Sequence, residues 1–205
     1  MRLYHHPLSF NSWRAVMCAL QLDVAVELVP VDLRGGAQRE PDFLRLNPNH
    51  RVPVLEDGPF VLWESHAIMQ YLADTTPDQR LYPSGPRERA DVNRWLFWSA
   101  YHLSPAVRDL YWERVIKVML GRGAADPEVI ARAEEQVREL SGVLERQLRG
   151  REWICGPALT LADLAIAAPF GVWESAQLPI ARDSHLGEWF ARMRALEAWR
   201  RTEEP

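Results

Sequence analysis

Apolar and polar positions follow two different periods in the first part of the chain. Leu3 and Tyr4 begin a short strand, and residues 24–31 form a second strand in which side chains alternate with a period of two. Between them, residues 12–22 carry apolar side chains at helical spacing. A helix that links two strands in this way predicts a βαβ unit with parallel strands.

A hairpin and a helix are predicted next. Residues 47–74 read NPNHRVPVLEDGPFVLWESHAIMQYLAD. The apolar runs 52–55 and 60–63 flank Asp57-Gly58, a dipeptide typical of a tight hairpin turn. Helical spacing then runs from Ser65 to about Asp74. Residues 34–41 read as a loop and residues 42–46 as at most a short helix, so the order is β-α-β, short helix, β-β-α.

Strand signals almost vanish in the second half. Residues 87–120 keep a helical rhythm, with a kink expected at Ser104-Pro105, and a long amphipathic helix runs from Asp126-Pro127 to about residue 148. Thr160-Leu161-Ala162-Asp163 resembles a capping box before a further apolar helix. The sequence therefore predicts an α/β domain at residues 1–76, a proline-rich linker at 77–86 and an all-helical domain at 87–205.

Two dipeptides within residues 47–74 are candidates for ligand binding. Pro53 has no N–H for a strand ladder, so it either begins an edge strand or follows a cis bond that turns the Val52 N–H and C=O toward an extended peptide ligand. Glu64-Ser65 lies at a helix N-terminus, where a carboxylate is favoured and Glu64 can receive an ammonium group. The alternative is an ordinary N-cap.

Together, Val52-Pro53 and Glu64-Ser65 resemble the glutathione transferases, and the order of elements extends the resemblance along nearly the whole chain. The resemblance implies a thioredoxin-like first domain. In that family a cis Val-Pro dipeptide contacts the cysteinyl backbone of glutathione, and the Glu-Ser pair holds its γ-glutamyl end. The chain resembles a bacterial serine-type member of the cytosolic type, with similarity to the theta, phi and zeta classes.

A glutathione transferase stabilises the thiolate of glutathione with a donor at the start of the first helix. Ser9, Asn11 and Ser12 can all donate there. By its spacing to Arg14, Ser9 matches the activating hydroxyl of serine-type classes and is the first choice, whereas Asn11 matches an asparagine of some bacterial members. Ser12 is equally interpretable as the N-cap of the helix.

The same segment also resembles the S-S-C-S-W-R run of zeta-class isomerases, through Ser9 and Ser12-Trp13-Arg14, but Asn11 replaces the cysteine. That replacement argues against a mixed disulfide at this position. The predicted function is therefore addition of the glutathione thiolate to an electrophilic small molecule, an activity of detoxification. Two alternatives remain: a glutathione-dependent isomerase or peroxide or disulfide reductase, and a non-catalytic ligand- or partner-binding relative.

Further binding residues follow from the resemblance. Gln38 matches a position that reaches the glycyl carboxylate, and Arg51 is a second candidate for an anion, although a loop glutamine and a rim arginine are equal alternatives. The electrophile pocket is expected on the first helix of the second domain. Its candidate aromatic residues are Trp98, Tyr101, His102 and Trp112. Residues at such spacing are also typical of ordinary core packing.

Composition limits the other partners. The 28 acidic and 24 basic side chains leave a net charge of −4, which gives no general electrostatic reason to bind nucleic acid. No apolar run is long enough for a bilayer and the first residues do not resemble a signal peptide, so we expect a cytoplasmic protein without a membrane partner. Cys18 and Cys155 form no metal or disulfide pattern, and no metal is expected. The resemblance implies glutathione as cosubstrate and a homodimer.

Overall fold

The computed structural model describes residues 1–203. These residues form two compact units, which are described separately. The first unit contains residues 1–82 together with the C-terminal segment that begins at residue 196, and the second contains residues 83–195. The boundary after residue 82 lies within the predicted linker, at residues 77–86.

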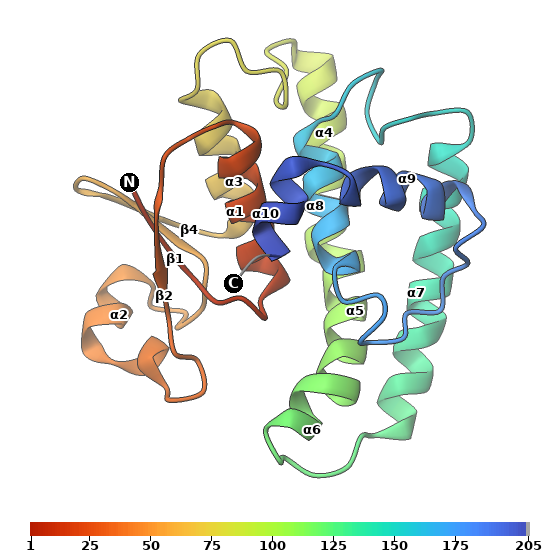
Figure 1. Ribbon diagram of the computed structural model, residues 1–205, viewed down its shortest axis with the longest axis horizontal. Coiled ribbons are helices and arrows are strands. Elements are labelled where there is room, and N and C mark those ends of the chain that lie inside the picture. The colour runs from red at the N-terminus through yellow and green to blue at the C-terminus, as the bar shows by residue number, and fades with distance from the viewer. Residues whose placement is uncertain (204–205) are drawn as a thin grey trace. The chain divides into compact units, whose positions relative to one another are not determined.

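A four-stranded mixed sheet is the centre of the first unit (Figure 1). Its strands are β1 (Arg2–His5), β2 (Glu27–Pro30), β3 (Val54–Asp57) and β4 (Phe60–Trp63), arranged in the order β2-β1-β3-β4. Strand β1 is parallel to β2 and antiparallel to β3, and β3 is antiparallel to β4. The predicted βαβ unit and hairpin are therefore confirmed, and with them the thioredoxin-like fold.

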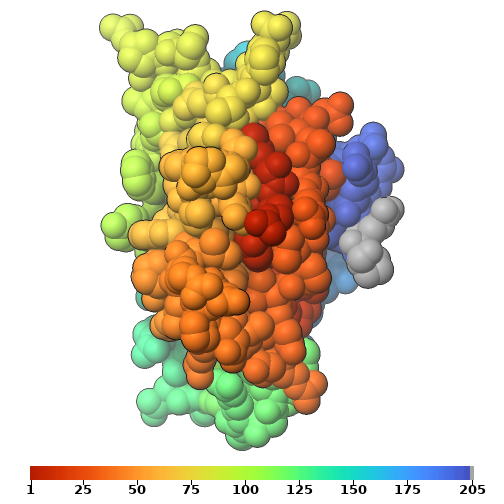
Figure 2. Space-filling model, turned by 90° about the vertical axis from the view of Figure 1, so that its left-hand side faces the viewer, coloured from red at the N-terminus to blue at the C-terminus, as the bar shows by residue number. Residues whose placement is uncertain are grey.

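Helices cover both faces of this sheet. Helices α1 (Phe10–Gln21) and α3 (Ser65–Asp74) lie on one side of the strands, and α2 (Pro41–Leu46) lies on the other, as Figure 1 shows. Leu3 and Leu55 are paired in register and fully buried, whereas Val54 packs with Phe43 of α2. Successive residues thus point to opposite faces, and both faces have a core. The orange segment that contains α2 forms much of the surface in Figure 2.

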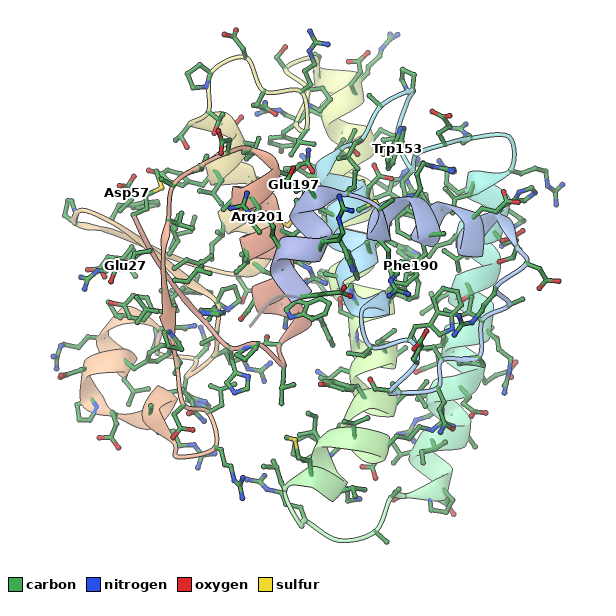
Figure 3. The ribbon with its side chains drawn as sticks, viewed as in Figure 1. Glu27, Asp57, Trp153, Phe190, Glu197 and Arg201 are labelled. Atoms are coloured by element: carbon green, nitrogen blue, oxygen red, sulfur yellow. The ribbon has the colours of Figure 1, made fainter. Side chains whose placement is uncertain are left out.

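The first strand of the hairpin begins later than predicted, whereas the second lies at the predicted residues. Strand β3 begins at Val54 and not at Val52, because Pro53 cannot donate to the ladder. The two residues between the strands are Gly58 and Pro59, and Gly58 has the φ of +58° that the first position of a tight hairpin turn requires. Asp57 therefore ends the strand (Figure 3).

The second unit is built from helices. They are α4 (Pro86–Trp98), α5 (Ser104–Tyr111), α6 (Lys117–Met119), α7 (Pro127–Leu148), α8 (Leu161–Phe170) and α9 (His185–Arg194). The kink expected at Ser104-Pro105 is a π-helical turn, Ser99–Leu103, directly before α5, and a second such turn spans Trp112–Ile116. A proline that lacks its N–H is accommodated at the first turn of α5.

The predicted capping box organises the core of this unit. Asp163 is fully buried in α8, where its carboxylate accepts hydrogen bonds from the N–H and hydroxyl of Thr160 at 2.9 and 3.1 Å. It also accepts from the Ile154 N–H at 2.8 Å and from the Trp189 indole at 2.9 Å. One carboxylate therefore joins the start of α8, the preceding loop and α9.

The C-terminal helix α10 (Glu197–Glu203) belongs to the first unit. Sequence patterning placed all of residues 87–205 in one helical domain, but Trp199 is buried and its ring lies 5.7 Å from that of Trp13 on α1. Glu197 and Arg201 lie one turn apart on this helix, with Arg201 Nη1 3.9 Å from Glu197 Oε1 (Figure 3). Burial of the Trp199 ring against α1 explains this grouping.

No helix within residues 1–203 is both long and apolar enough to cross a membrane.

Candidate functional site

Ser9 follows the loop after β1 and directly precedes α1. It is the N-cap of the helix, and its Oγ accepts a hydrogen bond from the Ser12 N–H at 3.3 Å. The side chain is only half-buried, so the hydroxyl proton can be donated to a ligand at the positive end of the helix. The N-cap role that the sequence allowed for Ser12 belongs to Ser9.

Ser12 and Asn11 differ in accessibility. Ser12 is fully buried, and its Oγ accepts from the backbone N–H of His6 at 3.2 Å. Ser12 therefore stabilises the loop between β1 and α1. Asn11 is half-buried, and its Oδ1 accepts from Arg14 Nη1 at 2.8 Å. Among the three predicted donors, Ser9 and Asn11 remain accessible to a ligand.

The loop before Ser9 is held from two directions. The indole of Trp13 donates to the carbonyl of Pro7 at 2.7 Å, and the Leu8 N–H donates to His6 Nδ1 at 3.1 Å. Because Trp13 packs edge-on against Trp199, the C-terminal helix helps to fix this loop.

Arg14 is a buried cation one turn into α1. It is 1% exposed, and its Nη1 donates both to Asn11 Oδ1 at 2.8 Å and to Ser65 Oγ at 3.2 Å. Burial lowers the pKa of Arg14 to about 9, and the nearby Glu64 opposes that shift. The guanidinium is still protonated at neutral pH, and it joins the starts of α1 and α3.

The Val52-Pro53 peptide bond is cis, as one of the two sequence interpretations proposed. Val52 is buried and lies just before β3. Among residues 1–203 the backbone N–H and C=O of Val52 take no part in a backbone hydrogen bond. They are available for an extended ligand to pair with, as an added strand pairs with a sheet edge.

Glu64 and Ser65 form the start of α3. Glu64 is the exposed N-cap residue and has a φ of +74°, which is uncommon for a residue with a side chain. Such conformations cluster at functional sites. Ser65 is buried in the first turn, where the helix N–H groups favour an anion.

His66 follows Ser65 and has an unusual environment. Its Nε2 is buried and has no hydrogen-bond partner among residues 1–203. Burial, with a smaller effect of the charge on Arg14, holds the pKa of His66 well below its usual value. His66 is therefore neutral at physiological pH.

Two softer candidates lie in the same unit. Gln38, in the short 3₁₀ helix Ala37–Arg39, is half-buried, and its amide donates to the Leu33 carbonyl at 3.3 Å. Its Oε1 is buried without a partner among the described residues. Arg51 is exposed next to Val52, and its carbonyl accepts from Asn47 at 2.8 Å. Gln38 thus points into the protein, whereas the Arg51 side chain is open to solvent.

Both cysteines are buried thiols. Cys18 Sγ lies 3.7 Å from the Met69 carbonyl, and burial raises the pKa of Cys18 far above its ordinary value. Burial, together with the charges of Asp91 and Asp163, raises the pKa of Cys155 to about 12. Neither thiol has the environment of a nucleophile. Within residues 1–203 no cluster of three or more metal-ligating side chains occurs.

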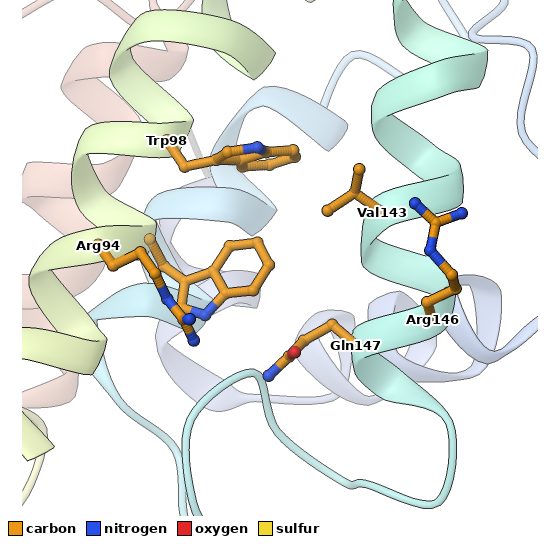
Figure 4. Close-up of a pocket in the computed structure, with 6 residues that line it drawn as sticks. Arg94, Trp98, Val143, Arg146 and Gln147 are labelled. Atoms are coloured by element: carbon orange, nitrogen blue, oxygen red, sulfur yellow. The ribbon is translucent and has the colours of Figure 1, made fainter.

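The aromatic candidates of the second unit do not gather at one place. The rings of Trp98 and His102 are tilted against each other, with centroids 6.4 Å apart. Tyr101 is 77% exposed, and Trp112 lies further along the chain, with the guanidinium of Arg122 at 5.7 Å from its ring. Trp98 also lines a pocket of about 400 Å³ between α4 and α7 (Figure 4). The other lining residues are Arg94, Trp95, Val143, Arg146 and Gln147.

Sequence reasoning missed Arg14 and His66 as parts of the site. Arg14 served only as a spacing marker, although a cation within the apolar face of the helix at residues 12–22 was a signal that it is buried. His66 carried no such signal, because its neighbours Ser65 and Ala67 are compatible with an exposed histidine.

Comparisons with known proteins agree over both halves of the chain. Residues 1–74 match the family model of the glutathione S-transferase N-terminal domain, and residues 127–202 match that of the C-terminal domain. Glutathione S-transferase F10 of Arabidopsis thaliana is 34% identical over 203 residues, which cover 95% of this chain and 92% of the relative.

Solved structures show the same similarity. Glutathione transferase F2 from Populus trichocarpa superimposes with a TM-score of 0.91 at 25% identity, covering 99% of this chain and 97% of that one. The theta class glutathione S-transferase from Xanthomonas axonopodis pv. citri, solved with glutathione bound, gives a TM-score of 0.86 at 32% identity and covers 100% and 97% of the two chains.

Proposed function

The chain belongs to the glutathione S-transferase family, and from this premise we propose that it is a glutathione transferase whose first unit binds glutathione and activates its thiol for attack on an electrophile. The observation that carries the proposal is the convergence of two helix N-termini. Arg14 of α1 donates to Ser65 of α3, so the accessible donors of α1 lie near the start of α3. Two helix N-termini together favour a ligand that carries two anionic groups.

The residues of the first unit can each be given a role. Ser9 donates to the thiolate, with Asn11 as a second donor. Val52 pairs with the cysteinyl backbone through its unused N–H and C=O. Glu64 receives the γ-glutamyl ammonium group, and Ser65 with the α3 N-terminus receives the γ-glutamyl carboxylate. Support comes from the half-buried Ser9, the cis bond at Pro53 and the unusual backbone of Glu64.

Arg51 is proposed for the glycyl carboxylate because its side chain is exposed beside Val52. Gln38 is a second contact only if its inward-pointing amide turns, since it now donates to Leu33. A reoriented Gln38 would also expose the Oε1 that has no partner among the described residues.

Glutathione binding tests the proposed function directly. We expect calorimetry to detect binding of glutathione, and Glu64→Gln to weaken it about tenfold, because an interaction between charged groups is reduced to one with a neutral amide. An analogue without the γ-glutamyl amine should bind the native protein weakly and Glu64→Gln no more weakly. Conjugation to a nitroaryl chloride, followed by absorbance, then tests the transferase step.

Glu40→Gln is the matched control, since Glu40 is an exposed N-cap carboxylate of the same unit without a capping hydrogen bond. Its glutathione affinity should equal that of the native protein. If glutathione does not bind, the proposed function fails. If both variants weaken binding equally, the role of Glu64 fails and only general electrostatics remains.

The electrophile and the assembly are further parts of the proposal. The aromatic residues Trp98, Tyr101, His102 and Trp112 favour an apolar or aromatic electrophile, and a detoxifying role in the cytoplasm fits two unpaired buried thiols. A homodimer is supported by Phe97, which is 64% exposed, and by Tyr101 one turn further on the same face. Sedimentation equilibrium should give twice the mass of one chain, and the mass of a single chain would contradict it.

A further inference from the structure

Arg14 is a costly residue to bury. Burial removes a guanidinium from water, and neighbouring charges and hydrogen bonds offset that cost only when their geometry is good. Its Nη1 donates to Asn11 Oδ1 at 2.8 Å and to Ser65 Oγ at 3.2 Å. Its Cζ lies 5.9 Å from the centroid of the Phe10 ring. Two of its hydrogen-bond acceptors, Asn11 and Ser65, are side chains that have been assigned to the two ends of glutathione.

We propose that Arg14 is a positioning residue that aims the donors of Asn11 and Ser65 at glutathione, so that one buried cation sets both thiol activation and γ-glutamyl binding. This inference rests on the proposed function. Arg14 itself does not touch the ligand.

The effect on Asn11 follows from donor and acceptor chemistry. A guanidinium has five N–H donors and no acceptor, so the group that faces Arg14 must be the carbonyl oxygen of the Asn11 amide. The amide nitrogen then lies on the other side. No hydrogen bond from Asn11 Nδ2 is made within residues 1–203, and the side chain is half-buried. Asn11 is therefore oriented to donate to a thiolate.

The effect on Ser65 is similar. Its Oγ accepts from Arg14, so its one proton is left to be donated elsewhere. A cationic donor on the oxygen also makes that proton a stronger donor. Because Ser65 begins α3, its hydroxyl adds to the N–H groups that already favour a carboxylate.

The surrounding charges keep Arg14 as the positive charge of this cluster. On α3, Glu64 favours the charged form of Arg14, and His66 is neutral because burial and the charge on Arg14 lower its pKa. His66 therefore adds no second positive charge beside Arg14. The positive charge of Arg14 is therefore in direct contact with both donors, Asn11 and Ser65.

This arrangement predicts a combined effect that no other residue of the site produces. Loss of Ser9 should raise the pKa of the bound glutathione thiol, and loss of Glu64 should weaken the affinity for glutathione. Loss of the Arg14 guanidinium should change both, since both donors lose their orientation. Both bonds come from Nη1, whose two N–H directions are fixed by the guanidinium plane, whereas a lysine keeps the charge as a rotating ammonium on a flexible stem.

The test measures the affinity for glutathione and the pKa of the bound thiol in the native chain and in Arg14→Lys, by calorimetry and by thiolate absorbance against pH. We expect the affinity to fall about tenfold and the thiolate fraction at pH 6.5 to fall about tenfold, as for the loss of one charge-assisted hydrogen bond. Met17→Ala, one turn further along α1 and 1% exposed, is the control for a lesion that only destabilises the fold. It should move neither quantity in its folded fraction.

A second measurement uses the native protein, so it holds even if Arg14→Lys does not fold. The side-chain amide resonance of Asn11 should shift when glutathione is added above the pKa of the bound thiol, and should shift less with S-methylglutathione, which has no thiolate. If Arg14→Lys folds and changes neither affinity nor thiol pKa, or if the Asn11 resonance is the same with both ligands, the inference is wrong. If glutathione itself fails to bind the native chain, the proposed function fails instead.

Discussion

Replacing Ser9 by alanine should raise the pKa of the bound glutathione thiol by about 1 to 2 units, because a hydrogen bond to a charged group contributes about 1.5–3 kcal/mol and each unit corresponds to about 1.4 kcal/mol. The hydroxyl is half-buried at the N-cap of α1, so it can donate where the helix also favours negative charge. At pH 6.5, kcat/KM should fall about ten- to a hundredfold. Thiolate absorbance and pH–rate profiles measure both effects.

Three variants separate activation from capping. Ser9→Gly removes the hydroxyl but costs only a few tenths of a kcal/mol as an N-cap, so it should match Ser9→Ala in thiol pKa and exceed it in stability. Ser9→Thr should retain activity. Ser12→Ala should lower stability without moving the thiol pKa, because Ser12 is fully buried and bound to the His6 N–H. If Ser9→Ala and Ser9→Gly leave the thiol pKa unchanged, Ser9 is not the donor.

Replacing Asp163 by alanine should lower the free energy of unfolding by about 3–5 kcal/mol, because several buried donors are left unpaired at roughly 1–3 kcal/mol each. The carboxylate accepts four hydrogen bonds, from Ile154, twice from Thr160 and from Trp189. Alanine would leave these donors buried and unpaired. Urea denaturation followed by tryptophan fluorescence measures the loss.

Asp163→Asn and Thr160→Ala should each cause a smaller loss in the free energy of unfolding. Asparagine keeps one acceptor but turns an N–H₂ group toward donors, so its loss should fall between those of alanine and the native chain. Thr160→Ala removes the hydroxyl that donates to Asp163 at 3.1 Å and caps the start of α8, and should cost about 1–2 kcal/mol. An Asp163→Ala protein that unfolds within 1 kcal/mol of the native chain, a margin of roughly one hydrogen bond, would contradict the structural role. Glutathione affinity should be unchanged in every variant that folds.

The local pattern of the sequence was sufficient for most elements of the fold. Period-two and helical spacing located β1, α1, β4 and α3, and the Thr160 to Asp163 spacing located the start of α8. These features depend on residues close in sequence, where propensity and capping act directly. The start of β3 lies two residues later than predicted, because Pro53 cannot donate to the strand ladder.

The candidate site was predicted less completely. Val52-Pro53 and Glu64-Ser65 were recognisable because each is a short motif with its own chemistry. The difference between Ser9 and Ser12 was not, since both are serines at a helix start and only burial separates them. Arg14 was overlooked because one of its acceptors, Ser65, lies 51 residues away in the sequence.

The sequence alone thus determined the order of strands and helices and, through the short motifs of residues 47–74, the family of the chain, because these follow from periodicity and from residues adjacent along the backbone. Tertiary structure decided that Ser9 is accessible and Ser12 is not, and that Arg14 is buried between the starts of α1 and α3. It also decided that Trp199, near the C-terminal end, packs on Trp13. Burial and the direction of a hydrogen bond depend on segments that meet only when the chain folds.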